Sequence, residues 1–230
     1  MTWVLANLDL IAQLALEHLR QSALPIVLGF LIAIPLGWVA FRYKLTRGPV
    51  LTITGLLYTI PSLALFALLP PTLGISYLSE ANLIIALTIY AVAIMARSIA
   101  DALGSVDADV RQAAVAMGYG PWRRFWTVEF PLAGPVVLAG LRVTAVSTIA
   151  LATVGILIGA DNLGYLFTNG LQRRIIPEVL CGVVAVMAIA LIVDGLLVLA
   201  GRLLMPWARR DRSRHRRRAA RAALPDGGAA

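Results

Sequence analysis

Hydrophobic residues fall into long runs that short polar segments separate. Five runs approach or exceed the roughly 20 mostly apolar residues that a helix needs to cross a bilayer, and the third run is the shortest. The runs are Ser22 to Phe41, Val50 to Leu69, Asn82 to Ala96, Pro135 to Ala160 and Pro177 to Gly201. This pattern predicts an all-α, polytopic membrane protein with about five transmembrane helices.

The first 20 residues have a different pattern. They lack a basic start and include Asp9 and Glu17 among apolar residues, so a cleaved signal peptide is not expected. Trp3 is of the type that anchors a helix at the membrane surface. We therefore expect an amphipathic, interfacial N-terminal helix ahead of the first transmembrane helix.

Basic residues indicate how the chain is oriented. They gather between the first and second runs, between the third and fourth, and after the fifth, and the positive-inside rule places these connections in the cytoplasm. The other two connections then lie outside, although one contains Arg173 and Arg174. The predicted protein has its N-terminus outside and its C-terminus in the cytoplasm.

The composition agrees with a membrane protein, because 60% hydrophobic and 14% charged residues are too apolar for an ordinary soluble domain. The net charge of +8 comes largely from a tail, in which eight arginines lie between Arg209 and Arg221. We expect a membrane domain over residues 1–207 and a disordered, basic cytoplasmic tail over residues 208–230. Such a tail is more typical of contact with anionic lipid headgroups than with nucleic acid.

Several classes of site are disfavoured. Cys181 is the only cysteine, which excludes an internal disulfide and a multi-cysteine metal site. His18 and His215 lie outside the predicted spans and far apart in sequence, so no metal or other cofactor is expected. The spans contain no histidine, Ser-Lys pair or pair of aspartates, which makes an intramembrane enzyme the weakest hypothesis.

The connection between the third and fourth runs contains a segment, about residues 105–131, that we call the coupling loop. The connection is longer than a chain reversal requires. Ser105 or Asp107 can cap a first helix. Gly118 suits the left-handed end of that helix, and a second helix then runs from Pro121 to Pro131. We predict two short helices joined at a glycine.

The first predicted helix offers a face on which small alanines allow a partner to approach closely. The residues on or near this face are Val110, Ala113, Ala114 and Met117. Aromatic and basic residues in the second helix suit a rigid link to the membrane helices; they are Trp122, Arg123, Arg124, Phe125 and Trp126. An ordinary amphipathic segment at the membrane surface would have the same composition.

The segment QAAVAMGYGPWRRFWTVEFP resembles the signature loop of binding-protein-dependent ABC importer permeases. That signature is Glu-Ala-Ala, three residues, glycine, nine residues, an aliphatic residue, one residue and Leu-Pro. The corresponding positions are Gln112, Ala113, Ala114, Gly118, Val128, Phe130 and Pro131. This chain departs from the signature at Gln112, Val128 and Phe130, and the first departure removes a negative charge.

The resemblance implies a type I importer-like fold in a bacterial plasma membrane, with a coupling helix over Ala108 to Met117 that docks on an ABC ATPase subunit. The ATPase-coupling residues that it implies are Gln112, Ala113, Ala114, Met117, Gly118, Val128 and Pro131. No GxxxxGK[ST] phosphate-binding segment occurs in the chain, so ATP hydrolysis is expected in a separate subunit. A second permease subunit, identical or related, and an extracytoplasmic substrate-binding protein are the other implied partners.

From Tyr58 onward the chain also resembles the osmoprotectant subgroup, whose members import glycine betaine, choline or carnitine. The segments YTIPSLALFALLPPTLGI, VEFPLAGPVVLAGLRVTAV and IGADNLGYLFTNGL carry this likeness, with a departure at Asp161 and Asn162, where two small residues are expected. A type I importer of amino acids or other small polar solutes remains an alternative. A passive or ion-coupled carrier is another, but it would not explain the coupling loop.

Polar residues within the spans suggest two further features. The candidate translocation path comprises Thr59, Ser62, Thr144, Ser147, Thr148 and Gly155, although hydroxyl groups in membrane helices commonly bond to their own backbone or a neighbouring helix. Arg142 and Asp194 enter their spans to similar depth and can form an ion pair. Alternatively, Arg142 extends to the interface and Asp194 faces a water-filled cavity.

Overall fold

The computed structural model describes residues 2–207, and within this range the chain forms helices and no strand. The helices are α1 (Thr2–Ala6), α2 (Leu8–Arg42), α3 (Lys44–Thr59), α4 (Ser62–Leu73), α5 (Glu80–Gly104), α6 (Ala108–Ala116), α7 (Pro121–Arg124), η1 (Phe125–Glu129), α8 (Phe130–Ala152), η2 (Thr153–Ile158), α9 (Gly164–Gln172) and α10 (Ile176–Leu204). The predicted all-α fold is confirmed. The predicted basic tail lies outside the described residues.

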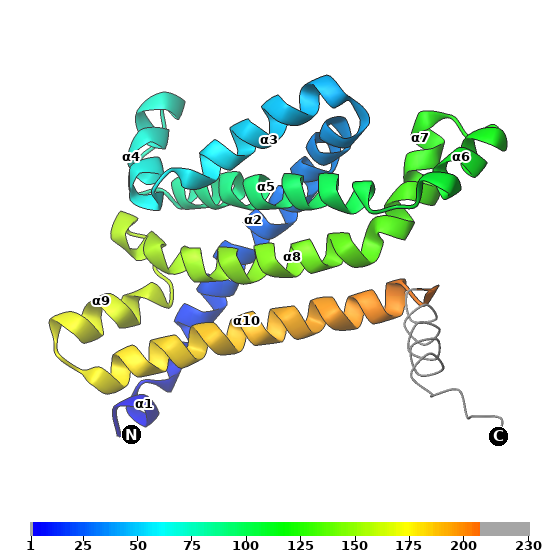
Figure 1. Cartoon of the computed structure of the whole chain (residues 1–230). Helices are drawn as coiled ribbons and strands as arrows, with labels where there is room; N and C mark the ends of the chain where they lie inside the picture. The colour runs from blue at the N-terminus through cyan, green and yellow to red at the C-terminus, as the bar shows by residue number, and fades with distance from the viewer. Residues whose placement is uncertain (1, 208–230) are drawn as a thin grey trace, which may run out of the picture.

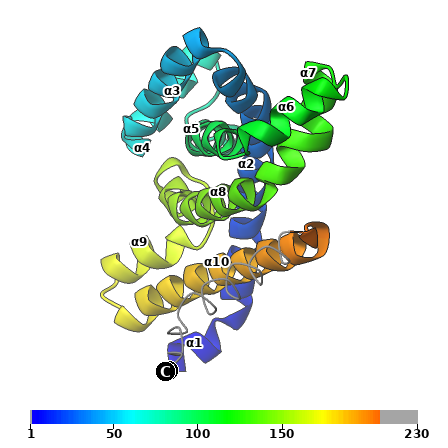
Figure 2. The ribbon, with the colours of Figure 1, turned by 45° about the vertical axis from the view of Figure 1, so that its right-hand side comes forward.

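Helices α5, α8 and α10 lie side by side with alternating directions, and α2 crosses behind them (Figures 1 and 2). Helix α2 packs against α5 where glycines allow the backbones to approach. A Cβ added at Gly37 would lie only 2.6 Å from Ile99 Cγ2, and one added at Gly29 would collide with Ala91. Small residues therefore set the crossing of α2 and α5, as is common between membrane helices.

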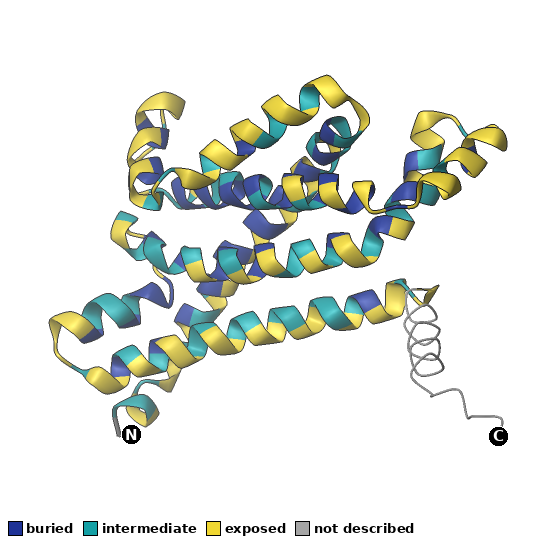
Figure 3. Cartoon of the chain, in the orientation of Figure 1, coloured by how far each residue is buried: buried dark blue, intermediate teal, exposed yellow. Residues whose placement is uncertain are grey.

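Four groups of buried side chains hold the bundle together among the described residues, and two of them are large. One group, at the end that carries α6, includes Ala33, Met95, Ile99, Leu103, Phe125 and Val137. The other, nearer α9, includes Leu65, Phe66, Leu83, Leu87, Tyr90 and Ala152. Helix α10 packs on the two smaller groups through half-buried side chains, among them Val186 and Ile189, and its visible surface alternates between half-buried and exposed residues (Figure 3). We call the two ends of the bundle the α6 end and the α9 end.

Helix α2 differs from the prediction. One helix runs from Leu8 to Arg42, so residues 8–20 and the first apolar run are continuous, and only the short α1 precedes them. No helix-breaking residue separates the polar start of this segment from its apolar part. His18, expected outside the spans, consequently lies in the bundle and is fully buried.

The second apolar run is not one straight helix. Helices α3 and α4 meet at an angle of 106° at Ile60 and Pro61. Proline lacks an N–H group and favours an extended conformation in the preceding residue, and Ile60 has φ −65° and ψ 126°. The hydroxyl group of Tyr90 donates a 2.6 Å hydrogen bond to the Ile60 carbonyl oxygen. The structure has four helices long and apolar enough to cross a membrane among the described residues, and the bent pair makes five.

Candidate functional site

The coupling loop forms a helix, a glycine turn and a second helix, as the sequence predicts. A side-chain oxygen of Asp107 accepts a 2.9 Å hydrogen bond from the backbone N–H of Asp109 and caps α6. Gly118 has φ +81°, a left-handed conformation that a side chain disfavours. Pro121 is the first residue of α7. Local sequence signals therefore determine the shape of this loop.

The second helix does not end at Pro131, which corrects the prediction. Helix α7 continues through the π-helix η1 into α8, and Pro131 lies in the first turn of α8. The backbone N–H of Phe130 bonds to the carbonyl of Phe125, five residues earlier, as in a π-helix. Pro131 lacks the N–H group of a regular helix, and it follows directly after the wider π-helical turn.

Aromatic rings connect η1 to the end of α2. Trp38 of α2 lies 5.9 Å from the ring centroids of both Trp122 and Phe125. Phe125 is buried and also contacts Trp126, at 4.8 Å between centroids. Edge-on aromatic pairs of this kind add to the stability of a packed cluster. The cluster packs α7 and η1 against the end of α2.

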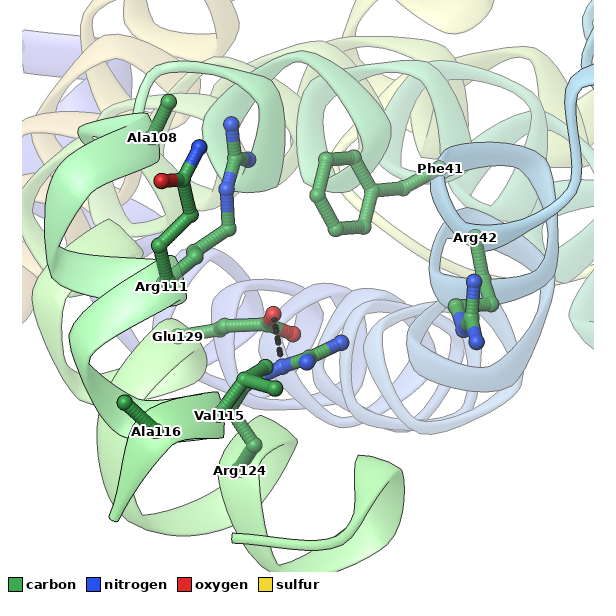
Figure 4. A pocket seen from close by; sticks show the side chains of 9 residues that line it. Phe41, Arg42, Ala108, Arg111, Val115, Ala116, Arg124 and Glu129 are labelled. Atoms are coloured by element: carbon green, nitrogen blue, oxygen red, sulfur yellow. Dashed lines mark hydrogen bonds and ion pairs between the residues drawn. The ribbon is translucent and has the colours of Figure 1, made fainter. Parts of the chain in front are cut away.

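A cavity of about 540 Å³ lies between α6, η1 and the end of α2 (Figure 4). Nine residues line it: Phe41, Arg42, Ala108, Arg111, Gln112, Val115, Ala116, Arg124 and Glu129. The carboxylate of Glu129, 2% exposed, accepts a 2.7 Å hydrogen bond from Arg124 Nε across a turn of η1. The Arg111 guanidinium lies 5.4 Å from the centroid of the Phe41 ring. Three arginines and one carboxylate line the cavity, so its formal net charge is positive.

The predicted coupling residues of α6 differ in their exposure. Gln112, Ala113 and Met117 are exposed, whereas Ala114 is 1% exposed and packs inward. Val128 and Pro131 are half-buried in η1 and α8, beyond the glycine turn. The structure therefore brings three of the predicted coupling residues to the free surface of α6. The other four belong to the parts that hold α6 in place.

The candidate path residues lie in different environments. The hydroxyl groups of Thr59 and Thr144 donate to backbone carbonyls of their own helices, over 2.7 and 2.9 Å. Thr148 and Gly155 are buried, and Ser62 and Ser147 are half-buried. At least two of these threonines therefore use their hydroxyl groups to bond to the backbone of their own helix, which is the alternative to lining the path.

Arg142 of α8 and Asp194 of α10 lie in direct contact. Arg142 Nε lies 2.6 Å from Asp194 Oδ1, and Arg142 Nη2 lies 2.7 Å from Asp194 Oδ2. Two parallel bonds of this kind make the strongest form of arginine–carboxylate pair. The pair lines a cavity of about 660 Å³ between the two helices. Its side chains remain partly accessible, 41% for Arg142 and 24% for Asp194.

A buried polar cluster, formed by His18, Gln21 and Asn162, was not found from the sequence. Asn162 Nδ2 donates to Gln21 Oε1 over 3.0 Å and to the carbonyl oxygen of Ala152 over 2.9 Å. His18 Nε2 lies 3.0 Å from the Ile149 carbonyl oxygen. The cluster joins α2 to the end of α8 and the loop after η2. The departure at Asp161 and Asn162 was the one available signal, and it pointed to an exterior loop instead.

Comparisons with known proteins cover most of the chain. Residues 25–206 match the model of a family described as "Binding-protein-dependent transport system inner membrane component". The chain is 34% identical over 200 residues to the osmoprotectant import permease protein OsmW of Salmonella typhimurium, covering 85% of this chain and 92% of that protein. It is 33% identical over 190 residues to the choline transport system permease protein OpuBB of Bacillus subtilis, covering 83% and 86%.

A solved structure has a similar fold. A chain of the MetNI methionine ABC transporter in an inward-facing conformation superposes with a TM-score of 0.74. The match covers 86% of this chain and 96% of that chain at 21% sequence identity. At this identity the likeness shows the fold alone.

Proposed function

The chain belongs to the family of binding-protein-dependent transport system inner membrane components, and from this premise we propose that it is the permease subunit of an ATP-driven importer of quaternary ammonium osmoprotectants. Glycine betaine, choline and carnitine are the proposed substrates. The relatives OsmW and OpuBB, with names that refer to osmoprotectant and choline transport, support this substrate class. The subunit itself is non-catalytic, and ATP hydrolysis belongs to a separate ABC ATPase.

The coupling loop is the observation that carries the proposal. Gln112 and Ala113 lie exposed on α6 and Met117 at its end, and α6 contacts α7 and η1. An ATPase that docks on this surface would move α6, and the fixed turn at Gly118 would pass the displacement to η1 and α8. Val128 and Pro131 act in this link rather than in docking.

The proposed orientation follows from the same loop. The α6 end faces the cytoplasm, the N-terminus lies outside, and a substrate-binding protein docks near α9. A second permease subunit, identical or related, covers the exposed faces of α3, α4 and α10. Thr59 and Ser62, on either side of the break at Pro61, and Ser147 are the proposed path residues, whereas the buried Thr144, Thr148 and Gly155 pack the bundle.

Replacing Ala113 by tryptophan tests the proposal. Ala113 is exposed, so Ala113→Trp should leave insertion and folding intact but obstruct the docking surface. We expect the amount of ATPase that co-purifies with the permease, and ATP-driven uptake of glycine betaine, to fall at least about tenfold, equivalent to about 1.4 kcal/mol of binding free energy.

The matched control is Leu31→Trp, which places the same side chain at an exposed position of α2, between the two proposed docking ends. This variant should retain the ATPase and transport normally. Unchanged co-purification and uptake in Ala113→Trp would remove α6 from the mechanism. If the unaltered importer takes up neither betaines nor choline, the proposed substrate class is wrong.

A further inference from the structure

The Arg142–Asp194 pair lies deep in the part of the chain that crosses the membrane. Asp194 is ten residues before the last residue of α10, a distance of about 15 Å along a helix. Helix α10 has 29 residues, about 43 Å, and the hydrocarbon core is about 30 Å thick, so the pair lies inside the span and not at its end. Charged groups at this depth are costly unless they face other protein groups or water. Their function therefore depends on what the open side of the pair faces.

The open side is turned away from the packed core of the bundle. On α8, Ala145 and Ile149 pack on α2, and the buried Thr144 contacts Met95 of α5. The cavity instead lies beside Val143 and Val146, which are both exposed in this chain. Lipid tails cannot solvate an ion pair that remains accessible. The cavity would be solvated if it faced the aqueous path between the two proposed permease subunits.

The cavity combines one guanidinium, one carboxylate and apolar walls. The remaining lining residues are Ala139, Val143, Val146, Ser147, Met187, Ala190 and Leu191. Its volume of about 660 Å³ lies within the roughly 300–1,000 Å³ that is usual for small-molecule sites. A betaine has the complementary groups, namely a carboxylate for the guanidinium, a quaternary nitrogen for the carboxylate and methyl groups for the apolar walls.

We propose that Arg142 and Asp194 form a low-affinity binding site for zwitterionic betaines in transit, in which Arg142 binds the carboxylate and Asp194 the quaternary ammonium group. The inference rests on the proposed function. In the empty site the two side chains satisfy each other, and a zwitterion replaces their two hydrogen bonds with one ion pair to each. Because binding requires this exchange, the net affinity is small, as a transport path needs.

The test compares glycine betaine with choline, which has the quaternary nitrogen but no carboxylate. Initial uptake rates of both are measured in proteoliposomes that contain the importer assembled with its ATPase and binding protein. Arg142→Gln should lower the ratio of betaine to choline uptake at least about tenfold, because only betaine loses an ionic contact. Asp194→Asn should lower the uptake of both. Arg20→Gln, which breaks the 2.7 Å ion pair between Arg20 and Glu80, should leave the ratio unchanged.

A labelling measurement covers the case in which a charge variant does not assemble. In a Cys181→Ala background, Ser147→Cys places a thiol in the wall of the cavity. Glycine betaine should slow the reaction of this thiol with a cationic thiol reagent, by about twofold when its concentration equals its dissociation constant. Sucrose at the same concentration should have no effect. Absence of protection by betaine overturns the inference.

The outcomes separate the two proposals. An unchanged uptake ratio in an assembled Arg142→Gln importer shows that the pair only braces α8 and α10, and the inference is then wrong while the proposed function stands. An importer that carries choline but no zwitterion likewise overturns the inference alone. If the unaltered importer takes up neither glycine betaine nor choline, both the inference and the proposed function are wrong.

Discussion

Helices α5 and α10 have opposite places in the molecule although both are long and strongly apolar. In α5, 61% of the most apolar stretch is buried within the chain, whereas in α10 none of it is. Six of the buried residues of α5 are alanines, Ala86, Ala91, Ala93, Ala96, Ala100 and Ala102. Small side chains let α2, α3 and α8 approach α5, whereas α10 directs leucine, isoleucine and valine outward.

Hydrophobicity alone thus tells which helix belongs in a bilayer but not what the helix faces. Helix α5 finds its neighbours within the chain. Helix α10 has a large apolar surface that can face lipid or another subunit. The partly exposed Arg142–Asp194 pair beside it is stabilised by water or protein groups and not by lipid tails. The proposed second permease subunit, on the side of α10, would supply further protein groups there.

The largest effect that distinguishes the two helices is expected from identical leucine truncations. Leu87 of α5 is 1% exposed, and Leu196 of α10 is 59% exposed. Leu87→Ala should lower the free energy of unfolding by about 2–5 kcal/mol, because it opens a cavity that the bundle cannot fill. Leu196→Ala should change it by less than about 0.5 kcal/mol in the isolated chain. Unfolding in detergent, followed by circular dichroism, measures both, and equal losses would contradict the comparison.

A slightly smaller effect is expected from adding side chains at glycines. Gly37 meets Ile99 and the carbonyl oxygen of Ala96, 2.9 Å from an added Cβ, whereas an added Cβ at Gly195 meets no atom of the described chain within 4 Å. Gly37→Leu should force α2 away from α5 and cost about 3 kcal/mol. Gly195→Leu is the matched control in α10 and should unfold at the normal temperature. If the free energy of unfolding of Gly37→Leu equals that of the unaltered protein, contacts other than the close approach to α5 hold α2 in place.

The buried polar cluster is the other contact that holds α2. Asn162→Ala removes two donated hydrogen bonds and leaves Gln21 Oε1 without that donor, so we expect a loss of about 1–3 kcal/mol in unfolding free energy. Asp161→Ala is the control, because the side chain of Asp161 is exposed and only its carbonyl is used, by Gln21 over 3.1 Å. The measurement is the melting temperature of each variant, compared with that of the unaltered protein. Identical melting temperatures would mean that the cluster contributes nothing.

The coupling loop was predictable because its signals are local. A capping aspartate, a glycine that adopts φ +81° and a proline at the start of a helix each act within a few residues. The apolar runs were predictable for the same reason, since the length and composition of one segment suffice. The end of the second helix was not, because the wide turn of η1 lets Pro131 enter α8 without a break.

Contacts between distant segments could not be predicted in this way. Gln21 and Asn162 are 141 residues apart, and a polar residue near the start of an apolar helix is expected to be exposed until its partner is known. The sharp turn at Pro61 was equally ambiguous, because a proline in a membrane helix can bend the helix or divide it. The bond from Tyr90 to the Ile60 carbonyl supports the divided form, and it comes from another helix.

The unbroken path from α7 through η1 and α8 to η2 has a mechanical consequence. These 38 residues, Pro121 to Ile158, form one continuous helical path, which bends at η1, so that α7 rises away from the axis of α8 (Figure 1). The 23 residues of α8 span about 35 Å at 1.5 Å per residue, and a tilt of about 5° over this length moves one end by about 3 Å relative to the other. Helix α6 lies next to the bend, and the far end of α8 lies at the opposite side of the bundle, where Gly155 packs against Leu83. If an ATPase docks on α6 as proposed, its displacement would reach the opposite side of the membrane through continuous helical backbone, with no intervening loop to absorb it.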